Sequence, residues 1–88
     1  MENEEVNKLL ELGKNIKLNP IMSSNISGIG YDESNRLLSV MFKGGSKYLY
    51  ENVEKEVFTA ICNSESVGRA LNECVVKNKE KYKYHKLV

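Results

Sequence analysis

The sequence predicts a small α+β domain: a three- to four-stranded antiparallel meander with two helices on one face, plus an extra N-terminal amphipathic helix. Three observations predict it. Residues 36–50 place apolar side chains at alternate positions on both sides of a Gly44-Gly45 turn, which is the pattern of a β-hairpin. Two later segments show the helical spacing of apolar residues. The chain has 88 residues, which is the size of one domain.

The N-terminal helix is predicted over residues 2–17. Its apolar stripe comprises Val6, Leu9, Leu10, Leu12, Gly13 and Ile16. Asn19-Pro20 ends the helix, because a residue before proline leaves the helical region. One apolar stripe does not tell which core it joins, so this helix packs either on its own domain or against a partner subunit. We place the helix and its linker at residues 1–22 and the main domain at residues 23–88.

Three strands of the meander follow. The first lies within residues 21–31, where Gly28 and Gly30 interrupt it, and residues 32–35 form a turn. The other two are the arms of the hairpin, one with Leu38, Val40 and Phe42 on one face and one with Tyr48 and Tyr50. The two tyrosines either join the core or form an exposed platform on which bases stack.

Two helices are predicted to cover the apolar face of this sheet. The first runs over residues 53–63 and the second over residues 67–77. Their inward positions are Val57, Phe58 and Ile61 in the first, and Leu71, Cys74 and Val75 in the second. Residues 80–87 add either a final short strand or an ordered tail.

The charge of the chain is unevenly distributed, although the net charge is only +1. The last twelve residues carry five lysines against Glu80, and Tyr82, Tyr84 and His85 lie between the lysines. Basic residues interleaved with rings are typical of a site for a phosphate-bearing ligand that stacks. The alternative is a solvated tail whose tyrosines pack on the domain.

Composition disfavours several classes of protein. Cys62 and Cys74 do not form a Cys-x-x-Cys pair, and we expect buried free thiols in a reducing compartment. Two separated cysteines and one histidine do not make a metal site, and we expect no cofactor. The sequence shows neither a secretion signal nor an apolar run of membrane-spanning length. We therefore expect a cytoplasmic protein with no membrane partner.

The sharpest candidate site is the start of the second covering helix. Ser66, Gly68 and Arg69 combine a capping hydroxyl, an open backbone and a guanidinium, a set that suits an anion such as phosphate. The alternative is that these residues only cap the helix and form local turn bonds. The polar residues expected to orient a ligand beside them are Ser23, Ser24, Asn25 and Asn72.

Taken together, these motifs follow one another in a familiar order. They are Ser23-Ser24-Asn25-Ile26, Ile29-Gly30-Tyr31-Asp32, Leu38-x-Val40-x-Phe42, Gly45-x-x-Tyr48-x-Tyr50, Val53, Ser66-x-Gly68-Arg69 with Asn72, and Tyr82-x-Tyr84. Over residues 23–87 the chain thereby resembles the KTSC domain family. The resemblance implies a domain of the kind found at the C-terminus of some lysyl-tRNA synthetases and as free-standing small bacterial or phage proteins. It also implies nucleic-acid binding, which is the function suggested for the family.

Two departures from the family pattern concern the helices. Glu54 stands where the family usually has proline, at a first-turn position that tolerates the change. Ala70 and Leu71 stand where the family often has two aromatic residues. If those rings stack on a ligand, that contact is weaker in this chain. If they belong to the core, the core of this chain is smaller.

We therefore predict a non-catalytic binding module for a phosphate-bearing ligand, either RNA or a small or cyclic nucleotide, which a phage-encoded form would sequester. Arg69 with Ser66 and Gly68 is expected to hold the phosphate. The rings expected to stack are Tyr48, Tyr50, Tyr82 or Tyr84. The alternative is an interaction or homo-oligomerisation module that docks through its N-terminal helix and binds no nucleotide.

Catalysis is disfavoured by the same residues. His85 has no carboxylate or nucleophile near it in the sequence, and no serine or cysteine has an evident base. The one catalytic alternative is an RNase-like use of His85 with Arg69.

Overall fold

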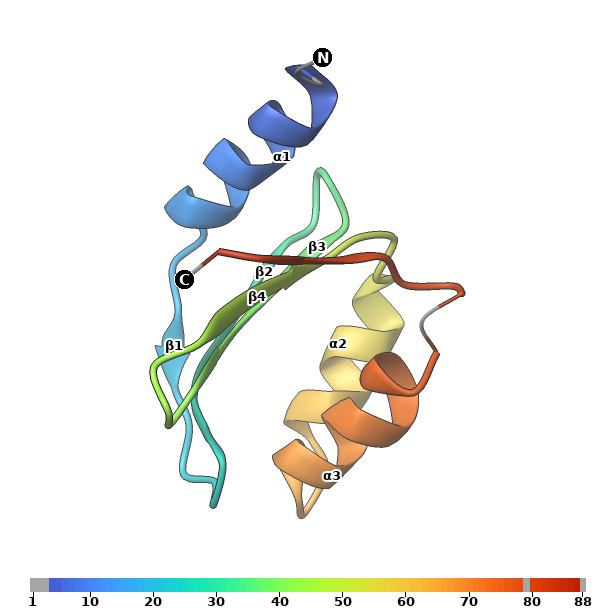
Figure 1. The fold of residues 1–88 in the computed structure, drawn as a ribbon. Coiled ribbons are helices and arrows are strands. Elements are labelled where there is room, and N and C mark those ends of the chain that lie inside the picture. The colour runs from blue at the N-terminus through green and yellow to red at the C-terminus, as the bar shows by residue number, and fades with distance from the viewer. Residues whose placement is uncertain (1–3, 79, 88) are drawn as a thin grey trace.

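Figure 1 shows a computed structural model of the protein, which describes residues 4–78 and 80–87. A curved antiparallel sheet forms the centre, with two helices side by side on one face and a third projecting beyond it. The elements are α1 (Glu4–Asn15), β1 (Asn19–Pro20), β2 (Ile26–Asp32), β3 (Leu37–Phe42), β4 (Lys47–Tyr50), α2 (Lys55–Cys62), α3 (Val67–Leu71), the π-helix η1 (Asn72–Val76) and β5 (Tyr84–Lys86). The predicted α+β class is confirmed.

The sheet has five strands in the order β1-β2-β3-β4-β5, each antiparallel to its neighbour. The sequence predicts only three or four. The unpredicted strand is β1, which pairs with β2 through Asn19↔Ile29 and Pro20↔Gly28. Proline lacks the N–H that a central strand needs, but β1 lies at the edge of the sheet, where this loss is tolerated. The final strand expected near the C-terminus is β5, which pairs with β4.

The helices lie close to their predicted ranges. Residues 1–3, the start of the predicted N-terminal helix, lie outside the described residues. The helix that begins at Val67 is α-helical only to Leu71; from there it widens into η1, where the Lys77 N–H donates to the Asn72 carbonyl at 3.0 Å. Single π-turns of this kind often occur at functional sites. Among the described residues no helix has the length and apolar character needed to cross a bilayer.

The main core lies between the inner face of the sheet and helices α2 and α3. Successive strand residues point to opposite faces, so Leu38 and Val40 share the inner face with Tyr48 and Tyr50. The buried cluster comprises Ile26, Ile29, Leu38, Val40, Tyr50, Val53, Ile61, Leu71, Val75 and Tyr82. Tyr50 therefore belongs to the core, and Tyr48 is half-buried at its border. The two rings are not an exposed platform.

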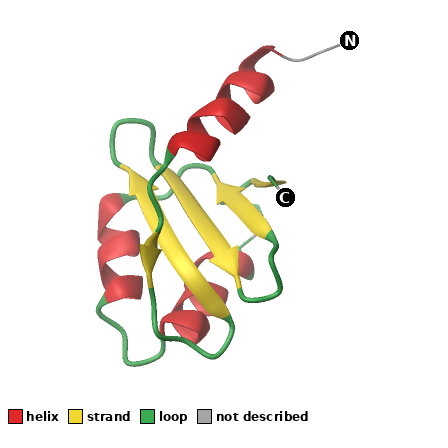
Figure 2. Ribbon diagram, turned by 90° about the vertical axis from the view of Figure 1, so that its left-hand side faces the viewer, coloured by secondary structure: helices red, strands yellow, loops and turns green. Residues whose placement is uncertain are grey.

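The outer face of the sheet is also covered, by the N-terminal helix, for which the sequence leaves open packing on its own domain or on a partner subunit. Leu37 and Leu49 point to this face and are 1% and 0% exposed. Gly13 of α1 lies against Leu49 so closely that a Cβ at position 13 would meet its methyl groups at 2.8–3.0 Å. The C-terminal end of α1 thus packs on its own domain, while Figure 2 shows the rest of the helix rising away from the sheet.

The expectation that both cysteines are buried is wrong. Cys62 and Cys74 are free thiols, and both residues are exposed. Their neighbours Ile61 and Val75 take the core positions instead. Partial burial nonetheless raises the pKa of the Cys62 thiol.

Candidate ligand-binding site

A cavity of about 350 Å³ opens between the inner face of the sheet and the segment formed by α3 and η1. This volume lies in the range of small-molecule sites. Its wall comprises Asn25, Phe42, Tyr48, Tyr50, Gly68, Leu71, Asn72, Val76, Tyr82 and Tyr84. Seven residues expected to bind a ligand therefore meet in one place: Asn25, Tyr48, Tyr50, Gly68, Asn72, Tyr82 and Tyr84. That they bind a ligand stays a prediction.

The wall also differs from the predicted set. Four predicted residues lie outside it, namely Ser23, Ser24, Ser66 and Arg69. Three wall residues are not in the predicted set, namely Phe42, Leu71 and Val76. Strand alternation carried a signal for Phe42, since it shares a face with Val40. The sequence gives no such signal for Val76, because an apolar residue at a helical position is equally typical of an ordinary core residue.

The sheet side of the cavity is a series of aromatic rings. Phe42 and Tyr48 meet edge to face with their centroids 5.7 Å apart, and Tyr48 meets Tyr84 at 6.0 Å. Tyr84 also lies 6.3 Å from Tyr50. Tyr84 is 51% exposed, whereas Tyr50 is 6% exposed. Tyr84 is therefore the ring with the most free surface for stacking on a ligand.

None of the described residues that line the cavity carries a charged side chain. Burial, together with the neighbouring hydroxyls of Tyr48 and Tyr84, raises the pKa of Tyr50 to about 12. The Tyr50 phenol therefore stays neutral at physiological pH. A neutral aromatic wall suits an uncharged ring, and a charged group of the same ligand is better solvated at the mouth.

The polar side of the mouth is built by the loop before β2. The Ser23 hydroxyl donates to Asn25 Oδ1 at 3.1 Å and accepts from the N–H groups of Asn25 and Ile26 at 3.4 Å each. Gly68 at the start of α3 lies directly against this amide, so a Cβ at position 68 would collide with Asn25 Oδ1. The loop and the helix start therefore meet, as the sequence analysis anticipates.

The start of α3 carries an N-cap. The Ser66 hydroxyl accepts a hydrogen bond from the Arg69 N–H at 3.3 Å. Ser66 therefore caps the helix. Its hydroxyl takes up the Arg69 N–H, which is one of the free N–H groups that an anion would need. The Arg69 guanidinium is exposed and forms no ion pair within residues 4–78 and 80–87, so it is available beside the cavity.

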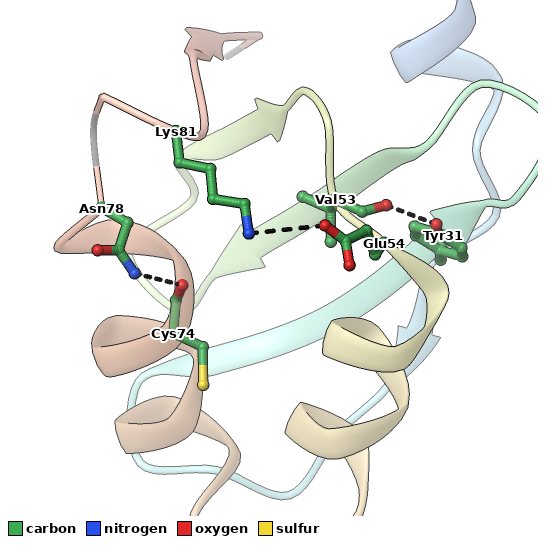
Figure 3. A network of polar contacts seen from close by, with 6 residues as sticks. All are labelled: Tyr31, Val53, Glu54, Cys74, Asn78 and Lys81. Atoms are coloured by element: carbon green, nitrogen blue, oxygen red, sulfur yellow. Dashed lines mark hydrogen bonds and ion pairs between the residues drawn. The ribbon is translucent and has the colours of Figure 1, made fainter.

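The C-terminal segment is tied to the helices around the cavity (Figure 3). The Asn78 side chain donates to the Cys74 carbonyl at 2.9 Å, which closes the end of η1. The Lys81 ammonium lies 3.5 Å from the Glu54 carboxylate before α2 and 5.3 Å from the Tyr82 ring centroid. Tyr82 itself is 3% exposed. It anchors this segment in the core while lining the cavity.

His85 lies on the other side of the sheet. Tyr84 faces the cavity, so the next residue of β5 points to the outer face, where it is paired with Leu49. There His85 Nε2 lies 2.6 Å from Glu51 Oε2. The carboxylate missing near His85 in the sequence is therefore supplied from the end of β4. Arg69, on a helix of the inner face, is not brought beside it.

The five-stranded meander with two helices on one face defines a small α+β domain. Comparison with known proteins identifies the family to which this domain belongs. The family model of the KTSC domain matches residues 22–82. The chain belongs to the KTSC domain family, and the resemblance read from its motifs is confirmed. The match begins after α1 and β1, so this helix lies outside it.

Relatives from several bacteria share this domain. The crystal structure of a KTSC domain protein from Yersinia pestis superposes with a TM-score of 0.72 at 31% identity, covering 83% of this chain and 99% of that chain. A protein of Tsukamurella paurometabola is 41% identical over 58 residues, which are 66% of this chain and 87% of the relative. A protein of Stutzerimonas stutzeri is 34% identical over 67 residues, which are 76% of this chain and 92% of the relative.

Proposed function

We propose that this KTSC domain is a non-catalytic module that binds a phosphate-bearing ligand, either a small nucleotide or RNA. The single observation that carries the proposal is the cavity: a neutral space of about 350 Å³ walled by five aromatic rings and two asparagines. Aromatic walls hold bases by stacking, and side-chain amides hydrogen-bond their edges.

Cations beside the mouth support the phosphate half of the proposal. Arg69 lies three residues before Asn72, which places the two on neighbouring parts of the helix surface. Lys86 is paired with Tyr48 across β4 and β5, so it lies on the same sheet face as the cavity. Both cations are exposed. A ligand whose ring enters the cavity would find its phosphate near them.

The absence of catalysis is part of the proposal and rests on the chemistry of the wall. Among the described residues of the wall there are no histidines, cysteines, serines, lysines or carboxylates to act as nucleophile or base. His85 is engaged with Glu51 on the outer face. Incubation with labelled RNA and nucleotides should give no product, and turnover lost in His85→Ala would contradict this part.

Thermal stabilisation by ligand tests the proposal. We expect nucleotides or short RNAs to raise the Tm of the native chain, because a ligand that binds only the folded state stabilises it. Arg69→Ala should weaken this binding about tenfold, as expected when a charge-assisted hydrogen bond is lost. Lys14→Ala, a matched loss of a cation on α1, should leave it unchanged. Equal stabilisation of both variants, or none by any ligand, would contradict the proposal.

A second function is favoured by one observation on α1. The first half of this helix projects beyond the sheet (Figure 1), and its Leu9 and Leu10 are only half-buried. An amphipathic helix as short as α1 is marginal without a surface to pack on, so a protein partner or a second copy would stabilise it. Concentration-dependent dimerisation that is lost on deleting residues 1–18, with no ligand-induced rise in Tm, would favour this function over the first.

A further inference from the structure

We propose that the cavity takes one nucleobase and reads its edge through the amides of Asn25 and Asn72, with Ser23 and Gly68 as positioning residues. This inference rests on the proposed function and names the part of the ligand that enters. A cavity of about 350 Å³ has room for one ring system of this kind rather than several stacked bases. The ligand is therefore a mononucleotide or a single unpaired base of a strand.

Hydrogen bonds fix which way the Asn25 amide points. The Ser23 hydroxyl oxygen accepts from two backbone N–H groups, so both of its lone pairs are used. Its one proton must then go to an acceptor, and that acceptor is Asn25 Oδ1 at 3.1 Å. Asn25 Nδ2 has no hydrogen-bond partner in the described part of the chain. A hydrogen-bond donor of fixed orientation is thus left at the mouth of the cavity.

Gly68 makes this placement of the amide possible. The residue belongs to the cavity wall and lies against two polar residues of the loop, Ser23 and Asn25: a Cβ there would collide with Asn25 Oδ1 and approach Ser23 Oγ to 3.3 Å. An alanine at this position would displace the amide rather than the backbone, because the atom in the way is the end of a side chain. Gly68 therefore acts on a ligand through Asn25, in addition to forming part of the wall itself.

Asn72 completes the polar edge. It lies one turn along from Gly68 in the same wall, and its side-chain amide makes no hydrogen bond to another described residue, whereas its backbone N–H donates to the carbonyls of Gly68 and Arg69. Together the two amides offer donors and an acceptor. A nucleobase edge presents a complementary set of groups. A plain phenyl ring presents none and gains no hydrogen bond from these amides, so a ligand of the phosphotyrosine kind should bind more weakly than a nucleotide.

The surrounding charge selects between a base and an organic cation. A cage of aromatic rings also suits a quaternary ammonium group. Here, however, Lys86 neighbours Tyr48 on the same face, and Arg69 lies one turn before Asn72; neither forms an ion pair among the described residues. These charges repel a cation and attract the phosphate of a nucleotide. The electrostatics therefore favour a neutral base that carries an anionic group outside the cavity.

Isothermal titration calorimetry of the full chain tests the inference. The ligands are the four common nucleoside 5′-monophosphates, the corresponding uncharged nucleosides, phenyl phosphate and choline. We expect at least one nucleotide to bind, its nucleoside to bind more weakly, and phenyl phosphate to bind more weakly than the nucleotide. Asn25→Ala and Asn72→Ala should each weaken nucleotide binding about five- to tenfold, as expected for one hydrogen bond. Asn63→Ala, an exposed asparagine away from the wall, is the matched control.

Two further variants separate positioning from folding. Gly68→Ala should weaken nucleotide binding as much as Asn25→Ala, whereas Gly44→Ala should not, since a Cβ at position 44 meets nothing within 4 Å. Asn25→Asp, measured with uncharged nucleosides, keeps the acceptor for Ser23 and removes the donor; it should bind them as weakly as Asn25→Ala. Circular dichroism and thermal melting establish that each variant is folded.

The outcomes distinguish this inference from the proposed function. Nucleotide binding that is indifferent to Asn25, Asn72 and Gly68, or phenyl phosphate that binds as well as the nucleotides, would overturn the reading of a base edge and leave the proposed function in place. Tight binding of choline in preference to nucleotides would overturn both. If none of these ligands bound the folded protein, the inference would fail. The proposed function would fail with it if short RNAs also gave no rise in Tm.

Discussion

Tyr50 shows how one residue serves the core and the cavity together. Its ring is packed among the inner-face residues, yet part of it lines the cavity beside Tyr48 and Tyr84. Moving its phenolate into this site is unfavourable, because burial removes solvation and the two neighbouring tyrosines would repel the charge when ionised. The Tyr50 side chain therefore stays uncharged over the whole physiological pH range.

The raised pKa of Tyr50 makes stability depend on pH. Its folded pKa of about 12 exceeds the ordinary 10.0, so the stabilisation is complete below pH 10 and is lost as pH rises from 10 to 12. We predict that the free energy of unfolding, measured by urea titration, falls across this window. Tyr50→Phe should reduce the fall. A variant with the same decline as the native protein would contradict the assignment to Tyr50.

Gly30 and Gly44 provide a matched test of close packing. A Cβ at position 30 would collide with the backbone carbonyl of Lys17, which has little freedom to move, whereas position 44 is open. We predict that Gly30→Ala lowers the free energy of unfolding by about 2–3 kcal/mol and that Gly44→Ala changes it by about 0.5 kcal/mol or less. Equal effects in urea titration would show that the linker before β1 does not pack as described.

At the scale of elements, strand β4 connects the two faces of the protein. Tyr48 and Tyr50 line the cavity on the inner face, and Leu49 between them is covered by Gly13 of α1 on the outer face. The candidate ligand site and the N-terminal helix therefore lie on opposite sides of one sheet. The two proposed functions are physically separable, because each depends on a different face.

Removal of α1 tests this separation. We predict that deleting residues 1–15 lowers the free energy of unfolding by about 1.5–3 kcal/mol, the contribution of one fully buried leucine, because Leu49 becomes exposed. The affinity for a nucleotide should not change. Urea titration of the truncated protein measures its free energy of unfolding, and calorimetric titration of the folded protein measures its affinity for a nucleotide. A loss of affinity in a folded truncated protein would contradict the separation of the two faces.

Elements with strong periodicity were predictable from the sequence, and those set by tertiary contact were not. The hairpin of β3 and β4 follows from alternating apolar residues around a glycine turn. Strand β1 does not, since Asn19-Pro20 has neither the length nor the composition of a strand and pairs only because β2 lies beside it. The π-turn at Asn72 and the cover over Leu49 likewise depend on contacts between distant parts of the chain.

The residues of the candidate site could largely be predicted from the sequence, but their arrangement in space could not. The sequence marks Asn25, Gly68 and Asn72 as polar or open positions, and the fold brings them to one cavity. Their arrangement follows from the contact of a loop with a helix start some forty residues further along the chain. Ser66 shows the limit, because the same motif that suits an anion also caps a helix.

At the scale of the whole molecule, the small net charge favours a mononucleotide over a long RNA as the ligand. The net charge is +1, and the cations beside the cavity are few. Affinity for a mononucleotide should therefore fall about tenfold or less between roughly 50 and 200 mM salt, since only one or two phosphate contacts are made. Titrations at several salt concentrations measure this slope. Short RNAs titrated in the same way give the comparison: an RNA affinity that falls about a thousandfold or more would indicate that the ligand is a long RNA contacting the lysine-rich C-terminal segment.

The central claim is that a nucleotide binds in the cavity between the sheet and α3. Nuclear magnetic resonance titration of the isotopically labelled chain with nucleoside 5′-monophosphates tests it most directly, because every backbone amide reports separately. The account predicts saturable shifts at the loop 23–25, along β4, and over α3 and η1, with α1 unchanged. Shifts confined to α1 or to the outer face, or no shifts with any nucleotide, would contradict it.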